Sequence, residues 1–428
     1  MIIYILYILL SPLLWILLLI SLIFNNKIRL RFFSYRKLFN DSINKINETN
    51  KQVVLFHAAS NGELEQLKPF FREIDREKYF ILLTISSPSC INSIYQNEID
   101  SFCYQAFDFP LTVYKFLKKI KPKKYIITRH DIWPHHITIA KILSIKSYLI
   151  NANLPKSSKR IWPVFKLLYE FLFKKFNQIY TVSHSMENHI KKKLGDMKNI
   201  KNIGDTRFDQ IKYRRNNESN HLSTIENIKD SRNILFGSIE SRDINIIFDS
   251  LNEIQENFIK NNINLIFVPH EPDENILTNL ESKLKELDIK ATRYNTMINK
   301  NININLEGCE ALLIDRIGIL ADLYRYSSIS YIGCGFGDGV HNVAEPAIYG
   351  NTICFGPKFD ILNEAVEMLE KEIAYCIKDS KELSKVLNMI LNQKKLDKNS
   401  KKIKEYIELK CNLTKKIINE IFKKNNSN

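Results

Sequence analysis

A chain of 428 residues is long enough for two or three domains, and 45% hydrophobic with 25% charged residues is ordinary for a folded protein. The net charge of +15 favours an anionic partner, but no zinc-finger spacing, RNP motif or basic zipper region is present, so nucleic acid ranks last behind anionic lipid and acidic substrates. The seven scattered cysteines argue for a reducing compartment and against both a disulfide framework and a cysteine-based metal site.

Residues 1–26 form an apolar segment without a charged side chain, and about 20 apolar residues suffice to cross a bilayer as a helix. Pro12 is expected to kink that helix. The basic residues that follow place the rest of the chain in the cytoplasm by the positive-inside rule; they are Lys27, Arg29, Arg31, Arg36 and Lys37. A cleaved signal peptide is disfavoured because no basic region precedes the apolar run. A spanning anchor and an anchor lying in a single leaflet both stay open.

Apolar, β-rich runs alternate with helical stretches over residues 27–210. The expected strands are 53–56, 80–84, 125–128, 146–150 and 179–182, and the expected helices include 64–76 and 113–120. This alternation predicts an α/β domain with a parallel sheet and helices on both faces. Ligands of such sheets bind beyond the C-terminal ends of the strands.

A polar cluster, His57 to Glu63, follows the first of these strands directly. Glu63 opens the next helix, and a helix N-terminus is expected to lower its pKa so that it is ionised at neutral pH. An ionised carboxylate at this edge of the sheet can act as a general base on a hydroxyl. The alternative is a glutamate that only stabilises the helix dipole.

Two further polar clusters follow later strands. In residues 129–136, Asp131 suggests an acceptor-binding or acid/base role, while a histidine-based metal site ranks low because no known ligand spacing is present. In residues 151–160, the cations are suited to a substrate carboxylate or phosphate. Plain surface polarity is the alternative for both clusters.

Residues 211–232 are polar and predict a surface linker or a weak helix. The alternation then restarts, with strands expected at 233–236, 264–268, 311–314, 329–332 and 352–355, which predicts a second Rossmann-like domain over 233–400. Residues 401–428 are expected to form a C-terminal helix that packs back on the first domain or lies against the membrane. Two Rossmann-like halves with a cleft between them describe the GT-B glycosyltransferase architecture, although fold alone does not settle function.

The most informative stretch runs from Gly333 to Pro346, after the strand 329–332. Its four glycines allow sharp turns and close approach of a ligand, and Asn342 is placed to cap a helix that ends at Gly350. A strand, a glycine loop and a helix N-terminus together predict an anion or nucleotide site. A simple turn with a capping box between Asn342 and Glu345 is the alternative reading.

At this point the ordered motifs resemble one family, the 3-deoxy-D-manno-octulosonic acid (Kdo) transferases of lipopolysaccharide assembly. The resemblance runs from the anchor to about residue 370. Its most specific part is Gly339 to Pro346, similar to G-x-H-N-x-x-E-P. The other matching segments are His57 to Glu63, Arg129 to Pro134, Asn151 to Leu154, Gly204 to Asp209, Ile314 to Gly318, and Phe355 to Pro357.

The resemblance implies an inverting, metal-independent transfer of Kdo from CMP-Kdo to a lipid A precursor at the cytoplasmic side of the inner membrane, with no cofactor. Glu63 would be the catalytic base and Asp131 a second catalytic residue. Acceptor contacts would come from Ser60, Gly62 and Arg160. The implied donor-binding residues are Arg207, Gly237, Ser238, Pro269, His270, Gly333, Gly335, Gly337, Asn342 and Glu345, with Glu345 on the ribose hydroxyls.

Three positions depart from the family's pattern: Arg129 stands where many members have Glu, Asn153 replaces an Arg, and His270-Glu271 replaces an Arg-His pair. These departures put the donor contacts in doubt more than the class. The competing hypotheses are another membrane-associated GT-B transferase that uses a UDP-sugar or CDP-alcohol, and an inactive membrane-anchored scaffold.

Overall fold

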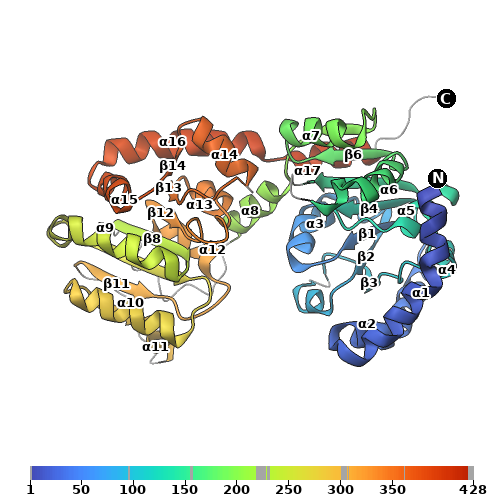
Figure 1. The fold of residues 1–428 in the computed structure, drawn as a ribbon, viewed down its shortest axis with the longest axis horizontal. Coiled ribbons are helices and arrows are strands. Elements are labelled where there is room, and N and C mark those ends of the chain that lie inside the picture. The colour runs from blue at the N-terminus through green and yellow to red at the C-terminus, as the bar shows by residue number, and fades with distance from the viewer. Residues whose placement is uncertain are drawn as a thin grey trace. The chain divides into compact units, whose positions relative to one another are not determined.

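The computed structural model describes residues 2–94, 97–154, 158–217, 228, 232–299, 306, 308–360 and 362–422. The chain divides into two units (Figure 1). Unit 1 comprises Met1–Gln210 together with Asn412–Asn428, and unit 2 comprises Ile211–Cys411.

Unit 1 is built on a parallel sheet of seven strands, in the order β3-β2-β1-β4-β5-β6-β7. The strands are β1 (Gln52–Ala58), β2 (Tyr79–Ile85), β3 (Ser101–Tyr104), β4 (Lys124–Thr128), β5 (Lys146–Ala152), β6 (Gln178–Thr181) and β7 (Ile200–Asn202). The five predicted strands are confirmed, and the short β3 and β7 were not predicted. The β-rich runs are buried almost throughout, as expected for a sheet covered on both faces.

The helices of unit 1 bury two apolar clusters against this sheet. These helices are α2 (Asn26–Asn47), α3 (Asn61–Glu73), α4 (Pro110–Ile120), α5 (Pro134–Ile142), α6 (Pro163–Phe173) and α7 (His184–Leu194). Two 3-10 turns lie at Pro88–Ser93 and Lys159–Ile161. Three of them begin with a proline, which suits the first helical position because its missing N–H needs no partner there.

Unit 2 repeats the plan with a parallel sheet in the order β10-β11-β9-β8-β12-β13-β14. Its strands are β8 (Arg232–Ile239), β9 (Ile263–Pro269), β10 (Lys290–Arg293), β11 (Glu310–Leu313), β12 (Ile329–Ile332), β13 (Thr352–Phe355) and β14 (Ala374–Cys376). Its helices are α9 (Ser241–Lys260), α10 (Glu274–Glu286), α11 (Tyr294–Asn299), α12 (Leu320–Leu323), α13 (Ala344–Tyr349), α14 (Asn363–Glu370), α15 (Ser380–Leu387) and α16 (Gln393–Lys410), with 3-10 turns at Tyr324–Tyr326 and Asn388–Leu391. The predicted second Rossmann-like domain is therefore present.

In both sheets the strand order reverses next to the first strand of the unit. In unit 1 the chain runs outward from β1 to β2 and β3, then returns so that β4 pairs with the other side of β1. In unit 2 the same reversal separates β8 from β12. Loops that leave two neighbouring strands in opposite directions open a crevice at their carboxyl ends, which is where such sheets bind ligands.

The N-terminal helix α1 (Ile2–Phe24) runs through Pro12 and lies along one side of unit 1 (Figure 1). Its residues Ile3–Phe24 have a mean hydropathy of 2.6, which makes the helix long and apolar enough to cross a membrane. The helix α8 (Arg207–Asn216) occupies the start of the predicted linker, and residues 218–231 lie outside the described part of the chain except Ile228.

The prediction of one C-terminal helix over 401–428 is wrong. The chain forms α16 and then α17 (Leu413–Phe422), separated at Asn412, whose φ of 63° lies in the left-handed region and ends the helix. Helix α17 packs on unit 1, where Ile417 and Ile421 complete an apolar cluster with residues of α3 and β1.

Truncation of Ile417 tests whether α17 is part of the core of unit 1. Ile417 is fully buried, so Ile417→Ala is expected to cost about 2–5 kcal/mol of unfolding free energy. The matched control is Lys416→Ala on the exposed face of α17, which should change stability little. The chain's three tryptophans, Trp15, Trp133 and Trp162, all lie in unit 1, so urea unfolding followed by tryptophan fluorescence reports on this unit alone. Equal urea midpoints for Ile417→Ala and Lys416→Ala would contradict the assignment of α17 to the core of unit 1.

Candidate functional site

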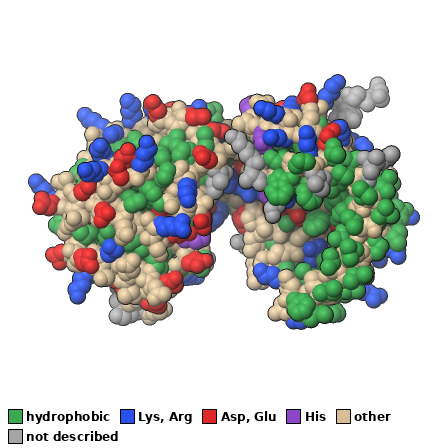
Figure 2. All heavy atoms as spheres, in the orientation of Figure 1, with side chains coloured by type: hydrophobic (Ala, Val, Ile, Leu, Met, Phe, Trp, Pro, Cys, Tyr) green, Lys and Arg blue, Asp and Glu red, His purple; other side chains and the backbone are tan. Residues whose placement is uncertain are grey.

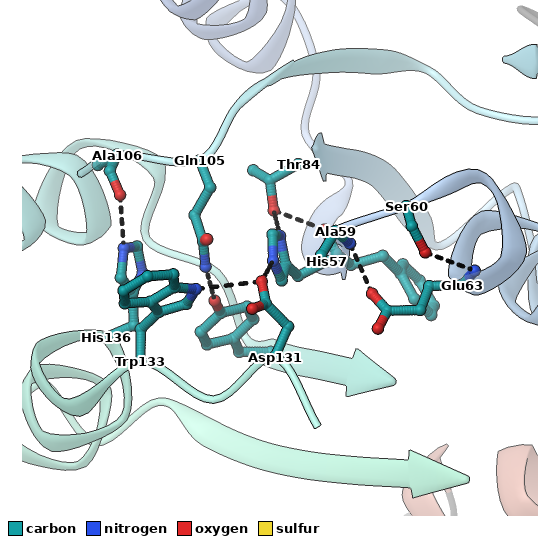
Figure 3. A network of polar contacts seen from close by, with 12 residues as sticks. His57, Ala59, Ser60, Glu63, Thr84, Gln105, Ala106, Asp131, Trp133 and His136 are labelled. Atoms are coloured by element: carbon teal, nitrogen blue, oxygen red, sulfur yellow. Dashed lines mark hydrogen bonds and ion pairs between the residues drawn. The ribbon is translucent and has the colours of Figure 1, made fainter. Parts of the chain in front are cut away.

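A network of polar side chains lies where β1 and β4 end in unit 1 (Figure 3). Nε2 of His57 lies 2.7 Å from Oδ2 of Asp131, and the indole N–H of Trp133 donates to the same oxygen at 3.1 Å. Nδ1 of His57 lies 3.1 Å from the Thr84 hydroxyl, which itself donates to the Phe56 carbonyl at 2.9 Å. Because that hydroxyl has a single hydrogen, it can only accept from Nδ1. Both ring nitrogens of His57 therefore face acceptor oxygens.

The surroundings of Asp131 keep its carboxyl ionised. Burial alone would raise its pKa, but the hydrogen bonds from His57 and Trp133 and the positive charge of Arg31 outweigh burial and hold the pKa below its ordinary value. Arg31 comes from α2, where its guanidinium donates to the Gln105 carbonyl at 2.7 Å. Burial lowers the pKa of Arg31 to about 10. The sequence assigned Arg31 only to the basic cluster beside the anchor and missed this role.

The surroundings of Glu63 shift its pKa in the opposite direction. Its side chain is buried at the start of α3, with Oε2 accepting from the Ala59 N–H at 2.6 Å. The prediction of a lowered pKa is wrong: burial, the largest effect, raises the pKa of Glu63, and the charge of Asp131 adds to the rise. The Ala59 N–H and the charges of His57 and Arg129 offset only part of it. A carboxylate with a raised pKa is a stronger base once it is ionised.

The predicted acceptor-binding residues lie around the same edge of the sheet. The Ser60 hydroxyl accepts from the Glu63 N–H at 3.4 Å and so caps α3, and Gly62 is exposed in the first turn. Arg160 donates through Nε to the Tyr169 hydroxyl at 3.0 Å, and its charge contributes to the lowered pKa of His130. The structure thus brings Ser60, Gly62, Glu63 and Asp131 to one edge and ties Arg160 to the loop after β4. Residues 155–157 lie outside the described part of the chain.

The structure gives no support to a metal site in residues 129–136. The backbone N–H groups of His135 and His136 donate to Asp108, and Nε2 of His136 lies 2.9 Å from the Ala106 carbonyl. Burial lowers the pKa of His136 to about 3, so its ring is a neutral part of the core. Among the described residues, no group of three metal-binding side chains includes these histidines.

In unit 2, two of the predicted donor-binding glycines, Gly333 and Gly335, are packed against backbone, whereas Gly237 and Gly337 have side chains as their nearest neighbours. A Cβ on Gly333 would clash with the Ser238 carbonyl, and a Cβ on Gly335 would lie 2.6 Å from the Gly356 nitrogen. A Cβ on Gly237 would lie 2.6 Å from the Tyr324 hydroxyl. Gly333 and Gly335 therefore let the loop after β12 lie against the end of β8 and the loop after β13, whereas the sequence assigned them to the approach of a ligand.

The other predicted donor residues lie around the same loops, with one exception. The Asn342 side chain accepts from the Ala344 N–H at 2.9 Å, two residues before the start of α13, and Gly350 ends α13 with a left-handed φ of 82°. Pro269 ends β9, and the His270 ring stacks on His341 with centroids 4.4 Å apart. The exception is Arg207, which belongs to unit 1, where Nε donates to Asp205 at 2.8 Å.

Among the described residues of unit 2, three side chains of metal-binding type lie close together. Glu240, Cys334 and His341 offer ligand atoms that all lie within 4.8 Å of one another. Glu240 and His270 also line a pocket with Arg242, Glu271, Asp273 and Asp338. The sequence missed this group because its members come from two separate loops and follow no known spacing; all seven cysteines are free.

The raised pKa of Glu63 predicts that Glu63→Gln stabilises the protein at neutral pH. A group with a raised pKa in the folded state contributes stability below its ordinary pKa of 4.5, and that contribution is lost as pH rises through the folded value. The variant should therefore melt at a higher temperature than wild type at pH 7. This difference in melting temperature should shrink as the pH falls toward 4. The control, Glu73→Gln at the exposed end of α3, should show no such pH-dependent gap. A variant that melts lower at pH 7 would contradict the buried-carboxyl account.

The chain is similar to known 3-deoxy-D-manno-octulosonic acid transferases over most of its length. A family model described as 3-Deoxy-D-manno-octulosonic-acid transferase (kdotransferase) matches residues 27–210. The 3-deoxy-D-manno-octulosonic acid transferase of Aquifex aeolicus (strain VF5) is 28% identical over 359 residues, covering 83% of this chain and 90% of that protein. The one of Rickettsia prowazekii (strain Madrid E) is 28% identical over 382 residues, covering 86% of this chain and 78% of that protein.

Among solved structures, the UDP-GlcNAc 2-epimerase of Neisseria meningitidis bound to UDP-GlcNAc aligns with a TM-score of 0.63 at 13% identity, covering 87% of this chain and 100% of that chain. At this identity the likeness shows the fold, a GT-B-like pair of Rossmann-like halves. The family model over residues 27–210 and the relatives that cover most of the chain make it similar to the 3-deoxy-D-manno-octulosonic-acid transferases, which are glycosyltransferases.

Proposed function

We propose that this chain transfers Kdo from CMP-Kdo to a hydroxyl of a lipid A precursor (lipid IVA), with inversion at the anomeric carbon. The observation that carries the proposal is a pair of carboxyls at the β1–β4 edge whose pKa values shift in opposite directions, in a chain similar to these transferases. Glu63 has a raised pKa and Asp131 a lowered one. Where the surroundings shift the pKa values of two carboxyls in opposite directions, the two groups suit different roles. Here these are a base and a charged positioning group.

In the proposed reaction Glu63 accepts the proton of the acceptor hydroxyl as its oxygen forms a bond to the anomeric carbon of Kdo. The bond from that carbon to the CMP phosphate breaks on the opposite face, and the electron pair leaves with the phosphate. Asp131 stays ionised between His57 and Trp133 and orients the acceptor. Ser60, Gly62 and Arg160 line the acceptor side of this edge.

The donor is proposed to bind unit 2 at the loops after β8 and β12, which meet where the strand order reverses. Glu345 would hold the ribose hydroxyls, because a carboxylate accepts two hydrogen bonds at once. Lys358 comes from the loop after β13, where Nζ donates to the Gly337 carbonyl at 2.7 Å, and it supplies a positive charge near the expected phosphate.

Membrane attachment is proposed to occur through α1, lying in one leaflet. One side of α1 is tied to unit 1: the Tyr7 hydroxyl donates to Asp108 at 2.9 Å, and the Tyr4 hydroxyl lies 2.9 Å from Nδ1 of His135. The other side is apolar and exposed, as Figure 2 shows, with Leu9 69% and Ile23 69% exposed. A helix that left the domain to span the bilayer would give up these bonds, so an in-plane anchor at the cytoplasmic face of the inner membrane fits both sides of α1.

A transfer assay with the detergent-solubilised full chain tests the function. With CMP-Kdo generated in situ and a tetra-acylated lipid A precursor, wild type should form product. Glu63→Gln should lower kcat/KM by about 10²–10⁴-fold, which is the usual contribution of a general base. Glu73→Gln on the same helix is the matched control and should retain activity. Equal rates for Glu63→Gln and wild type would move the base elsewhere.

Donor competition separates the proposed donor from its rivals. CMP should inhibit the transfer and UDP should not, because the donor leaves as CMP. Inhibition by UDP alone would assign the chain to a UDP-sugar donor within the same fold.

The in-plane anchor predicts that substitutions on the exposed face of α1 release the protein from membranes without unfolding it. Leu9→Gln, Leu13→Gln and Ile16→Gln together remove apolar contact with lipid while the bonds of Tyr4 and Tyr7 stay intact. Membrane flotation should move the triple variant to the soluble fraction, and the same positions changed to Met should stay bound. A folded Gln variant that still floats with the vesicles would contradict the proposal.

A further inference from the structure

Arg129 lies directly after β4, the neighbour of the strand β1 that leads to Glu63. Its φ of 59° lies in the left-handed region, where a residue other than glycine is strained. Its N–H donates to the Ile150 carbonyl of β5 at 2.9 Å, so the sheet holds the backbone in this conformation. Backbone strain of this kind is concentrated at sites that bind ligands, which directs attention to the Arg129 side chain.

Gln66 holds the guanidinium of Arg129 on the helix that carries the base. With the Gln66 amide turned so that both of its ends find partners, its oxygen accepts from Nε of Arg129 at 2.7 Å and from Nη2 at 3.1 Å. Gln66 is 2% exposed and follows Glu63 by three residues in α3. Residues with this spacing share one helix face, with Cβ atoms about 5–6 Å apart. The guanidinium is thus fixed beside Glu63, where burial raises the pKa of the carboxyl and the charge of Arg129 opposes that rise.

Arg160 brings a second cation to the same place. Its Nε donates to the Tyr169 hydroxyl at 3.0 Å, and its guanidinium carbon lies 5.7 Å from the centre of the Tyr169 ring, so α6 fixes its direction. Burial lowers the pKa of His130, and the charges of Arg160 and Arg129 add to this effect. Both guanidinium groups therefore lie near one imidazole ring, although they come from different loops.

His130 has an unsatisfied ring nitrogen near these two cations. Its Nδ1 is buried and has no hydrogen-bond partner among the described residues. Buried polar atoms in native proteins are nearly always hydrogen-bonded, so this nitrogen indicates a ligand atom. A neutral imidazole carries one N–H, which Nδ1 can donate to an anion. The carboxylate of the same loop, Asp131, already accepts from His57 and Trp133.

We propose that Arg129, His130 and Arg160 bind an anionic oxygen group carried by the acceptor. The inference rests on the proposed function, in which unit 1 binds the acceptor, and it names the group that is recognised. Guanidinium groups bind phosphate and carboxylate oxygens through charge-assisted hydrogen bonds. On a phosphorylated lipid A precursor this group is a phosphate, and on an acceptor that already bears Kdo it is the Kdo carboxylate. An anion held here orients the acceptor so that its hydroxyl approaches Glu63.

Binding of three matched glycolipids to the full chain in detergent, without CMP-Kdo, tests this anion subsite. The lipids are the tetra-acylated precursor, the same lipid without its phosphates, and the dephosphorylated lipid bearing one Kdo. Tryptophan fluorescence reports binding, because Trp133 and Trp162 lie close in sequence to Arg129 and Arg160. Wild type should bind at least one anionic lipid about 10–100-fold more tightly than the neutral lipid. The lipid that is preferred identifies the group as phosphate or carboxylate.

Substitutions separate recognition of the anion from a structural role. Arg129→Gln and Arg160→Gln should each remove most of the preference for the anionic lipid and leave the affinity for the neutral lipid unchanged. Arg129→Lys keeps the charge but not the planar guanidinium, so it should retain part of the preference. The matched control, Lys141→Gln, removes an exposed cation from α5 of the same unit and should bind all three lipids as wild type does.

Two results would overturn the anion subsite: equal affinity of wild type for the three lipids, or an equal loss for all three in Arg129→Gln, which would leave Arg129 a structural role alone. Because no donor is present, binding does not depend on transfer. A wild type that shows the expected preference but transfers no Kdo would count against the proposed function only.

Discussion

The structure depends on the all-parallel pairing of its two sheets. Parallel strands need a crossover for every connection, so helices cover both faces and every strand delivers its following loop to the same edge. The order of each sheet then reverses once, beside β1 and beside β8. The polar residues of each unit gather at that reversal: His57, Glu63 and Asp131 in unit 1, and Glu240, Cys334 and His341 in unit 2. The strand order alone therefore indicates where the functional side chains of each unit lie.

Within unit 1, the pKa of each carboxyl depends on how far protein hydrogen bonds and charges compensate for the hydration lost on burial. Asp131 receives a ring N–H from His57 and an indole N–H from Trp133, and so it stays charged although it is largely buried. Glu63 receives one backbone N–H and loses more solvation than it recovers. Two carboxyls on adjacent loops therefore differ in basicity because they differ in hydrogen bonds received and in the charges beside them.

The sequence predicted the long strands well because Val, Ile, Leu and Phe run continuously through β1, β2 and β9, as buried parallel strands require. It missed β10 and β14 because they are only four and three residues long and partly exposed, and Lys290 and Arg293 in β10 carry no strand signal. It found Glu63 and Asp131 by their place after a strand, but gave Glu63 the wrong pKa direction, since a helix N-terminus is visible in a sequence and burial is not. Arg31 reaches its site from the distant helix α2, which no local pattern records.

The return of α17 to unit 1 makes unit 2 an insertion within it, because residues 211–411 separate the two parts of unit 1. During synthesis the ribosome therefore exposes most of the first domain long before its last helix exists. At the usual elongation rate this interval is roughly 10–40 s. Throughout it, the surface later covered by Ile417, Ile421 and Phe422 is open, while α1 has already left the ribosome. Early capture of α1 by the membrane would hold this incomplete domain in place and away from other nascent chains until the final residues close it.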